Sequence, residues 1–327
     1  MVLETDYIGT LGRKLLGILN ANTFDGRTAC LTSGAPYPAG TPCGNAGFVN
    51  GFSSRRINTT IGSDNFRTNA FGSNYHGFQA SLRKRYSFGL QFNANYTYSK
   101  TLDELSDAFR AKAVGAFNAC ALADCTNAHV NYGPADFDVR HRGVVSYNYD
   151  LPFAKGSRWL GGWQVNGVFS VQTGVPVPVY DLNNDLNADG VQGADRPQYA
   201  SGFNGTNVIM NRSPGIQFLK PAGYATASCP VSENLGLWCN SPMHRNDVYG
   251  PHYANLDLGL GKSFKITEGS KLTFFANFFN IFNHPNFDTP QGNFSDPNAF
   301  GKSQSTVGND GFGNGHRIGQ LALRFDF

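Results

Sequence analysis

Hydrophobic and polar positions alternate without a break over the last eleven residues, Arg317 to Phe327. This period of two predicts a β-strand with one apolar and one largely polar face. An exposed apolar edge strand makes a soluble sheet prone to aggregation, whereas lipid covers the apolar face of a closed membrane barrel. The segment by itself fits either a membrane barrel or a soluble β-sandwich, and the rest of the chain favours the barrel. The segment's apolar side chains are expected to form a C-terminal membrane-assembly signal: Leu321, Leu323, Phe325 and Phe327.

The same alternation recurs along the chain and predicts about eight strands. The clearest runs from Phe88 to Ser99, after a turn at Tyr86-Ser87, and alternates apolar residues with small polar ones. Most segments approach the ~9–11 residues that a tilted membrane strand requires. The other strands are predicted at residues 2–8, 78–83, 144–149, 163–172, 255–261, 272–279 and 317–327. Aromatic residues near strand ends indicate interfacial girdles: Tyr98, Tyr149, Trp163 and Tyr253.

Short and long connections between these strands alternate strictly. The short ones are residues 86–87, 150–161 and 265–270, and the long ones are 11–74, 100–139, 174–252 and 282–315. Outer-membrane barrels combine tight periplasmic turns with longer extracellular loops. Compact soluble domains seldom contain unstructured loops of this length. The sequence therefore predicts an all-β fold, an antiparallel transmembrane β-barrel with short periplasmic turns and long extracellular loops.

Composition agrees with this prediction. Charged residues make up 15% of the 327-residue chain, below the roughly 25% of soluble domains, and aromatic residues make up 13%. Mean hydropathy is −0.32, and no apolar run approaches the ~18 residues of a spanning helix. The net charge of +3 is too small and scattered to indicate nucleic acid as a partner. No signal peptide precedes Glu4 and Asp6, so we expect the chain to be the C-terminal part of a longer protein.

The six cysteines fall as close pairs inside three of the long loops. The pairs are Cys30 with Cys43, Cys120 with Cys125, and Cys229 with Cys239. Fifteen connectivities exist for six cysteines, and bridges within each loop are the simplest of them. A metal site is disfavoured because the pairs lack CxxC spacing and have no neighbouring His at ligand spacing. The sequence therefore predicts loop-local disulfides in an oxidising compartment such as the cell exterior.

One long loop places oxygen-bearing side chains at alternate positions. Ca²⁺ binds clustered carboxylate and amide oxygens around a Gly turn, and Asp185 to Gly190 matches the start of such a loop. An EF-hand is excluded, because Arg196 occupies the position of its final Glu and no helices flank the loop. A calcium-binding extracellular loop and a solvated Asx-rich turn both remain as interpretations. The candidate ligands are Asp181, Asn183, Asp185, Asn187 and Asp189, and no other cofactor is predicted.

Other polar motifs indicate structural roles. Four charged residues precede or open one strand and predict salt bridges that anchor its mouth, in preference to substrate binding: Asp136, Asp138, Arg140 and Arg142. Thr101 to Glu104 matches a capping box and predicts a short helix. The S-x-x-K string at Ser81 lies in a predicted strand, where its Ser and Lys point to opposite faces. We find no active site and expect no enzymatic activity.

Several motifs occur together in an order that resembles one family. These motifs are Tyr7 to Leu15, Asn74 to Ala80, Phe137-Asp138-Val139-Arg140-His141-Arg142, Ser146-Tyr147-Asn148-Tyr149-Asp150-Leu151-Pro152-Phe153, Trp163-Gln164-Val165-Asn166-Gly167, Gln172-Thr173-Gly174-Val175-Pro176, Asp195-Arg196-Pro197 and Phe278-Phe279-Asn280-Ile281-Phe282-Asn283-His284-Pro285-Asn286-Phe287. With these motifs the chain resembles the C-terminal β-barrel of Oar-like TonB-dependent outer-membrane receptors of the acidobacterial type, and the resemblance covers essentially all of it.

The resemblance implies that residues 1–327 are the C-terminal fragment of a barrel of about 22 strands. The plug, the TonB-contacting segment and the regulatory domain would precede Met1. It also implies energy-coupled uptake of a scarce solute across the bacterial outer membrane. The expected partners are membrane lipid, the TonB system through the absent N-terminal parts, the barrel assembly machinery at the C-terminal strand, and an unknown extracellular solute. The alternative is a passive surface or adhesion barrel, complete with eight strands.

Overall fold

The structure, a computed structural model, consists mainly of β-strands and their connections. It describes residues 1–20, 65–107, 128–153, 157, 159–182, 196–210, 217–227, 243–307 and 315–327. Within these ranges, no helix is both long enough and apolar enough to cross a membrane. The long strands are β1 (Val2–Asn20), β2 (Asn65–Ser87), β3 (Leu90–Asp103), β5 (His141–Asp150), β6 (Trp163–Gln172), β11 (Tyr253–Lys265), β12 (Lys271–Phe279) and β13 (Ile318–Asp326).

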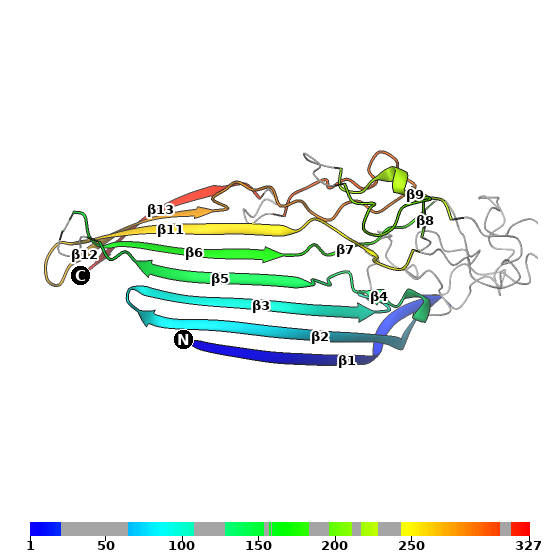
Figure 1. Ribbon diagram of the computed structural model, residues 1–327, viewed down its shortest axis with the longest axis horizontal. Helices are drawn as coiled ribbons and strands as arrows, with labels where there is room; N and C mark the ends of the chain where they lie inside the picture. The colour runs from blue at the N-terminus through cyan, green and yellow to red at the C-terminus, as the bar shows by residue number, and fades with distance from the viewer. Residues whose placement is uncertain are drawn as a thin grey trace, which may run out of the picture.

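These eight strands form one antiparallel sheet in the order β1-β2-β3-β5-β6-β11-β12-β13. Each long strand pairs with its neighbours along the chain, as the prediction of eight antiparallel strands requires. The short turns lie at one end of the sheet and the long connections at the other (Figure 1). In the described residues β1 and β13 are the two edges and do not pair with each other. The sheet is therefore open.

The register places one apolar row across six strands. Leu3 lies opposite Leu82, which lies opposite Ala94 on β3. The row continues through Val145 on β5 and Phe169 on β6 to Leu256 on β11. Because side chains alternate between the two faces of a sheet, all of these residues share one face, which we call the apolar face. The predicted alternation is thus confirmed strand by strand.

The opposite face, which we call the polar face, carries a row of amides. Gln91 on β3 is followed by Asn148, Asn166, Asn277 and Gln320 on successive strands, with Gly259 between the third and fourth amides. A Cβ at Gly259 would lie 2.2 Å from the Oδ1 of Asn166 and 2.7 Å from that of Asn277. Glycine is therefore the residue that lets these two amides approach each other over the strand.

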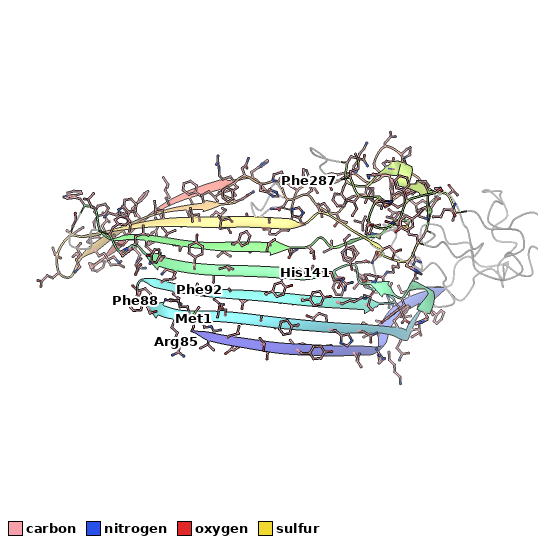
Figure 2. The ribbon with its side chains drawn as sticks, in the orientation of Figure 1. Met1, Arg85, Phe88, Phe92, His141 and Phe287 are labelled. Carbon is pink, nitrogen blue, oxygen red and sulfur yellow. The ribbon has the colours of Figure 1, made fainter. Side chains whose placement is uncertain are left out.

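The first turn lies two residues later than predicted. Ser87 pairs with Leu90, so Phe88 and Gly89 form the turn in place of Tyr86-Ser87. Both have positive φ, +54° and +80°, which defines a two-residue type I′ hairpin whose twist matches the strands. Phe88 belongs to this turn, at the short-connection end of the sheet, and is 99% exposed (Figure 2). The alternation that continues through Phe88 in the sequence hid the turn.

Several strands are longer than the alternation indicates. β1 extends to Asn20 and β2 begins at Asn65, because the register shifts between Gly12 and Gly17 break the alternation without ending the pairing. β3 continues through Asp103, so the predicted capping box lies largely in a strand. The described residues 104–107 contain no helical turn. Pairing with β2 and with β4 (Gly133–Pro134) overrides the local helix signal.

The long connections form a packed layer at one end of the sheet, which we call the loop cap. It contains β7 (Pro176–Val177) paired with β10 (Val248–Tyr249), and β8 (Gln198–Tyr199) paired with β9 (Tyr224–Ala225). Two short 3₁₀-helices, η3 (Ala128–Asn131) and η4 (Pro221–Gly223), accompany them. The buried hydrophobic core of the described residues lies here, because both faces of the sheet stay accessible. Its members are Val177, Val179, Val208, Leu219, Tyr224, Met243, Val248 and Phe300.

Candidate functional site on the polar face

A buried polar network joins two long connections at the mouth of the sheet, and we call it the polar latch. Arg245 Nη1 donates to Asp103 Oδ1 at 2.5 Å, and Arg245 Nη2 donates to Asp136 Oδ1 at 3.1 Å. The side chains of Arg245 and Asp103 are only 13% and 4% exposed. Arg140 lies 3.2 Å from Asp138, which is fully buried. The prediction that charged residues anchor the mouth of this strand is confirmed for Asp136, Asp138 and Arg140.

Tyr249 completes the polar latch. Its hydroxyl donates to Asp138 Oδ2 at 2.7 Å and accepts from Arg140 Nη2 at 2.9 Å. Burial, reinforced by the hydrogen bond to Asp138 and opposed by Arg140, raises the pKa of Tyr249 to about 12. The phenol therefore stays protonated at neutral pH and remains a donor to the carboxylate. The latch ties the connection before β5 to the one before β11.

The motif Phe278 to Phe287 is a turn that its asparagines hold in place. Asn280 donates to the carbonyl oxygens of His284 at 3.0 Å and Gly315 at 2.6 Å. Asn283 Oδ1 accepts from the backbone N–H of Arg317 at 3.0 Å. Asn280 and Asn283 have φ of +49° and +50°, and Asn adopts this conformation more readily than most residues. The motif therefore fixes the path between β12 and β13.

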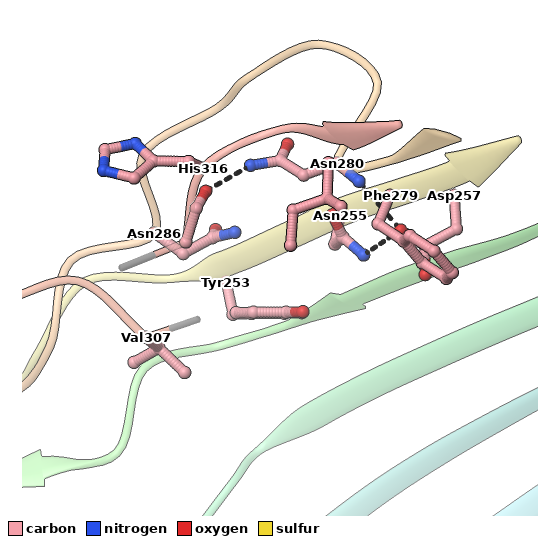
Figure 3. A pocket seen from close by; sticks show the side chains of 10 residues that line it. Tyr253, Asn255, Asp257, Phe279, Asn280, Asn286, Val307 and His316 are labelled. Carbon is pink, nitrogen blue, oxygen red and sulfur yellow. Dashed lines mark hydrogen bonds between the residues drawn. The ribbon is translucent and has the colours of Figure 1, made fainter. Parts of the chain in front are cut away.

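Beside this turn, the polar face is hollowed into a pocket, which we call the β11–β13 pocket (Figure 3). Tyr253, Asn255 and Asp257 supply its wall from β11, at the end of that strand near the loop cap. Asp257 is fixed because its Oδ1 accepts from Asn255 Nδ2 and from the backbone N–H of Asn280, both at 2.9 Å. The remaining lining residues are Phe279, Asn280, Asn286, Val307, Gly315, His316 and Ile318.

Sequence reasoning placed the main residues of this pocket differently or missed them. Tyr253 was predicted to join an interfacial girdle, but it pairs with Gln172 on the polar face and lines the pocket. Its position at the strand end was predicted correctly. It lies an even number of residues from Asn255 and Asp257 on β11, so its side chain shares the polar face with theirs. Asp257 was predicted to lie on the polar face, yet only the fold brings its carboxylate to the backbone N–H of Asn280. Arg245 of the polar latch lies inside a long connection and carries no periodic signal.

Of the five predicted calcium ligands, Asp181 lies within the described residues. Asp181 is buried, and its Oδ1 accepts from Ser295 Oγ at 2.5 Å. Ser295 also accepts from the backbone N–H of Leu182 at 2.8 Å, so Asp181 lies where the connection before β11 meets the one before β13. Asn183, Asp185, Asn187 and Asp189 lie outside the described residues. Calcium binding stays a prediction.

The remaining predicted residues fall into two groups. All six cysteines lie outside the described residues, so the disulfides stay predictions: Cys30, Cys43, Cys120, Cys125, Cys229 and Cys239. In contrast, the C-terminal apolar residues are described. Leu321 and Leu323 pair with Ala276 and Phe274 on the apolar face and are 69% and 67% exposed, and Phe325 pairs with Leu272. Phe327 is 95% exposed beyond the end of β13.

Comparisons with known proteins give a family and two distant likenesses. The chain aligns over 99% of its length with the outer membrane transporter YddB from Escherichia coli, at 9% identity and a TM-score of 0.45. It aligns over 99% with a chain of the FpvAI–pyocin S2 complex, at 13% identity and a TM-score of 0.37. It spans 30% and 26% of those two chains.

No curated protein matches the chain. A family model described as an outer membrane beta barrel domain matches residues 1–320, which is nearly the whole sequence. The open antiparallel sheet with one apolar and one polar face agrees with that match. The chain therefore belongs to the outer membrane β-barrel domain family and resides in the bacterial outer membrane.

Proposed function

We propose that the chain is the C-terminal part of a TonB-dependent receptor barrel that takes up a solute across the outer membrane. The observation that carries the proposal is the open sheet, whose polar face is rich in amides and remains accessible along β3, β5, β6 and β11. A closed barrel of eight strands has an interior just wide enough for its own side chains. Amides that face open space suit the wall of a wider, wet lumen.

In this proposal the strand edges β1 and β13 pair with further strands of a barrel of about 22. The plug, the TonB-contacting segment and the regulatory domain belong to the same protein and couple uptake to the TonB system. The Oar-like, acidobacterial character belongs to this proposal as well, supported by the motif order. The exposed apolar side chains from Leu321 to Phe327 would be read by the barrel assembly machinery.

The loop cap supports the capture of solute at the cell exterior. Its own hydrophobic core and the polar latch hold long connections together at one end of the sheet. Full burial of one Val, Leu or Phe side chain stabilises the folded state by about 1.5–3 kcal/mol. The core of the loop cap can therefore hold the connections in one defined conformation. The proposed loop disulfides and the calcium-binding loop would add to its rigidity.

Growth-linked uptake tests the proposal. Cells carrying the full-length gene are supplied with one limiting solute at a time, with an intact or an inactivated tonB gene, and growth is measured. We expect growth on at least one solute to require both this gene and tonB. We also expect it to fall when residues 174–252 and 282–315 are deleted together. Uptake that is independent of tonB, or unchanged by the deletion, contradicts the proposal and favours a passive surface barrel.

A further inference from the structure

The β11–β13 pocket presents hydrogen-bond donors and acceptors from three side chains: Asn255, Asp257 and Asn286. Asn255 and Asn286 are 8% and 3% exposed, and their amides are oriented by protein partners. Asn255 Nδ2 donates to Asp257, which leaves the Asn255 carbonyl oxygen as an acceptor. Asn286 Oδ1 accepts from the backbone N–H of Ala254 at 2.9 Å, which leaves its NH₂ group as a donor.

Asp257 adds a second acceptor. Its Oδ1 already receives two hydrogen bonds, while no described residue donates to its Oδ2. The same holds for the outer ends of the Asn255 and Asn286 amides within the described part of the chain. These three side chains thus combine two acceptors and one donor. These groups face the pocket, where the hydroxyls of a ligand would take the place of water as their partners.

The two aromatic side chains of the pocket complete its chemistry. Tyr253 and Phe279 line it from neighbouring strands, and Phe279 is 38% exposed (Figure 3). Aromatic rings offer flat apolar surface, against which the C–H face of a sugar ring packs. We propose that this pocket binds a neutral, hydroxyl-rich solute, a sugar unit whose hydroxyls bond to Asp257, Asn255 and Asn286. This inference rests on the proposed function and names the solute class for it.

Hydroxyl groups fit the pocket better than charged groups do. A hydroxyl donates one hydrogen bond and accepts others, so adjacent hydroxyls satisfy the acceptors Asp257 and Asn255 and the donor Asn286 together. An ammonium group only donates, so it would leave the Asn286 NH₂ group unpaired. A carboxylate or phosphate only accepts and would meet the negative charge of Asp257. Selection of this kind resembles sites that reject ligands lacking a matched hydroxyl.

The test uses isothermal titration of the full-length protein purified from outer membranes. The probes are neutral hexoses and their disaccharides, with spermidine as the cationic probe and gluconate as the anionic probe. At least one neutral sugar is expected to bind, and spermidine and gluconate are not. Asp257→Asn keeps the Oδ1 acceptor but turns the free oxygen into a donor, so sugar affinity should fall about tenfold to a hundredfold.

Matched variants separate binding from folding. Asp150→Asn is the control for Asp257→Asn. Asp150 is also a carboxylate on the polar face, but it bonds to Gln164 and Tyr86 outside the pocket, so sugar affinity should be unchanged. Phe279→Leu removes the ring at the pocket and should weaken binding, whereas Phe275→Leu, on the same face of β12 but outside the pocket, should not. Binding of spermidine alone, or sugar affinity indifferent to Asp257→Asn and Phe279→Leu, overturns the inference.

The titration is independent of energy coupling. If sugars bind through Asp257 but growth does not depend on tonB, the proposed uptake fails and the pocket assignment stands. If growth depends on tonB but no sugar in the panel binds, the pocket assignment fails and the proposed uptake stands. The two ideas are therefore tested separately.

Discussion

At the scale of single residues, the buried cations Lys262 and Arg245 have different partners because they lie in different parts of the fold. Lys262 lies on the apolar face by register, opposite Trp163 and Phe274. Its side chain reaches back to the carbonyl oxygen of Gly161 and lies 4.9 Å from the ring centre of Phe264. A lysine that snorkels in this way keeps its ammonium group hydrogen-bonded next to lipid. Arg245, in contrast, is paired with carboxylates inside the loop cap.

The Arg245→Met variant tests the polar latch. It leaves Asp103, whose side chain is 4% exposed, without its ion-pair partner. Breaking a buried pair by removing one partner costs about 3–5 kcal/mol. We expect faster proteolysis and hydrogen exchange in residues 128–140 and 243–249, with the sheet unaffected, measured by mass spectrometry on intact outer membranes.

Arg324→Met is the matched control for the latch. Arg324 lies 2.7 Å from Asp326 on β13, but the two side chains are 69% and 40% exposed. Exposed pairs contribute about 0–1 kcal/mol, so this variant should behave like the parent protein. Equal protection of residues 128–140 in Arg245→Met and in the control would show that the latch does not hold the loops.

At the scale of elements, the turns set the register of the strands. The type I′ turn at Phe88 and Gly89 joins β2 to β3 and places the apolar positions of both strands on one face. The backbone N–H of Asp150 donates to the Gly89 carbonyl at 2.8 Å, so the turn is also tied to the end of β5. A slip of one residue here would move every later side chain to the wrong face.

Gly89→Ala should destabilise this turn. Gly89 has a φ of +80°, and an added Cβ would lie 2.7 Å from the Asp150 carbonyl oxygen. The left-handed conformation alone costs a non-glycine residue about 1–2 kcal/mol. We expect a lower urea midpoint for the variant folded into lipid vesicles, followed by tryptophan fluorescence. Gly269→Ala is the control, because a Cβ there meets nothing within 4 Å. Identical midpoints for the two variants would refute this account of the turn.

At the scale of the whole molecule, the two faces of the sheet meet different surroundings. The apolar face meets lipid, since the family places this domain in the outer membrane. The polar face carries the amide row and the β11–β13 pocket. A soluble domain hides its apolar side chains in the interior, but here the buried core lies in the loop cap instead. Contact with lipid removes the apolar side chains of the sheet from water, as burial in a core does in a soluble domain.

Adjacent substitutions on β3 test this division. Ala94 lies on the apolar face opposite Leu82 and Val145, and Asn95 lies on the polar face opposite Ser81 and Val144. An arginine facing lipid near the bilayer midplane costs about 2–4 kcal/mol, whereas one facing water costs little. We expect Ala94→Arg to lower the amount of folded protein in the outer membrane, and Asn95→Arg to leave it near the parental level, both measured by immunoblot of membrane fractions. If Asn95→Arg lowered the amount of folded protein and Ala94→Arg did not, the assignment of the two faces would be wrong.

The sequence by itself determined the strands, their antiparallel order and the two faces, because period-two alternation is a local property of each segment. The first and last residues of the strands were less well determined. The bulges after Gly12 interrupt the alternation within a strand, and the turn at Phe88 continues the alternation where no strand is present. Only the tertiary structure brought Arg245 to Asp103, and Asp257 to Asn280. Those contacts join segments far apart in the chain, and irregular connections carry no periodicity from which to predict them. Packing of one loop against another decides them.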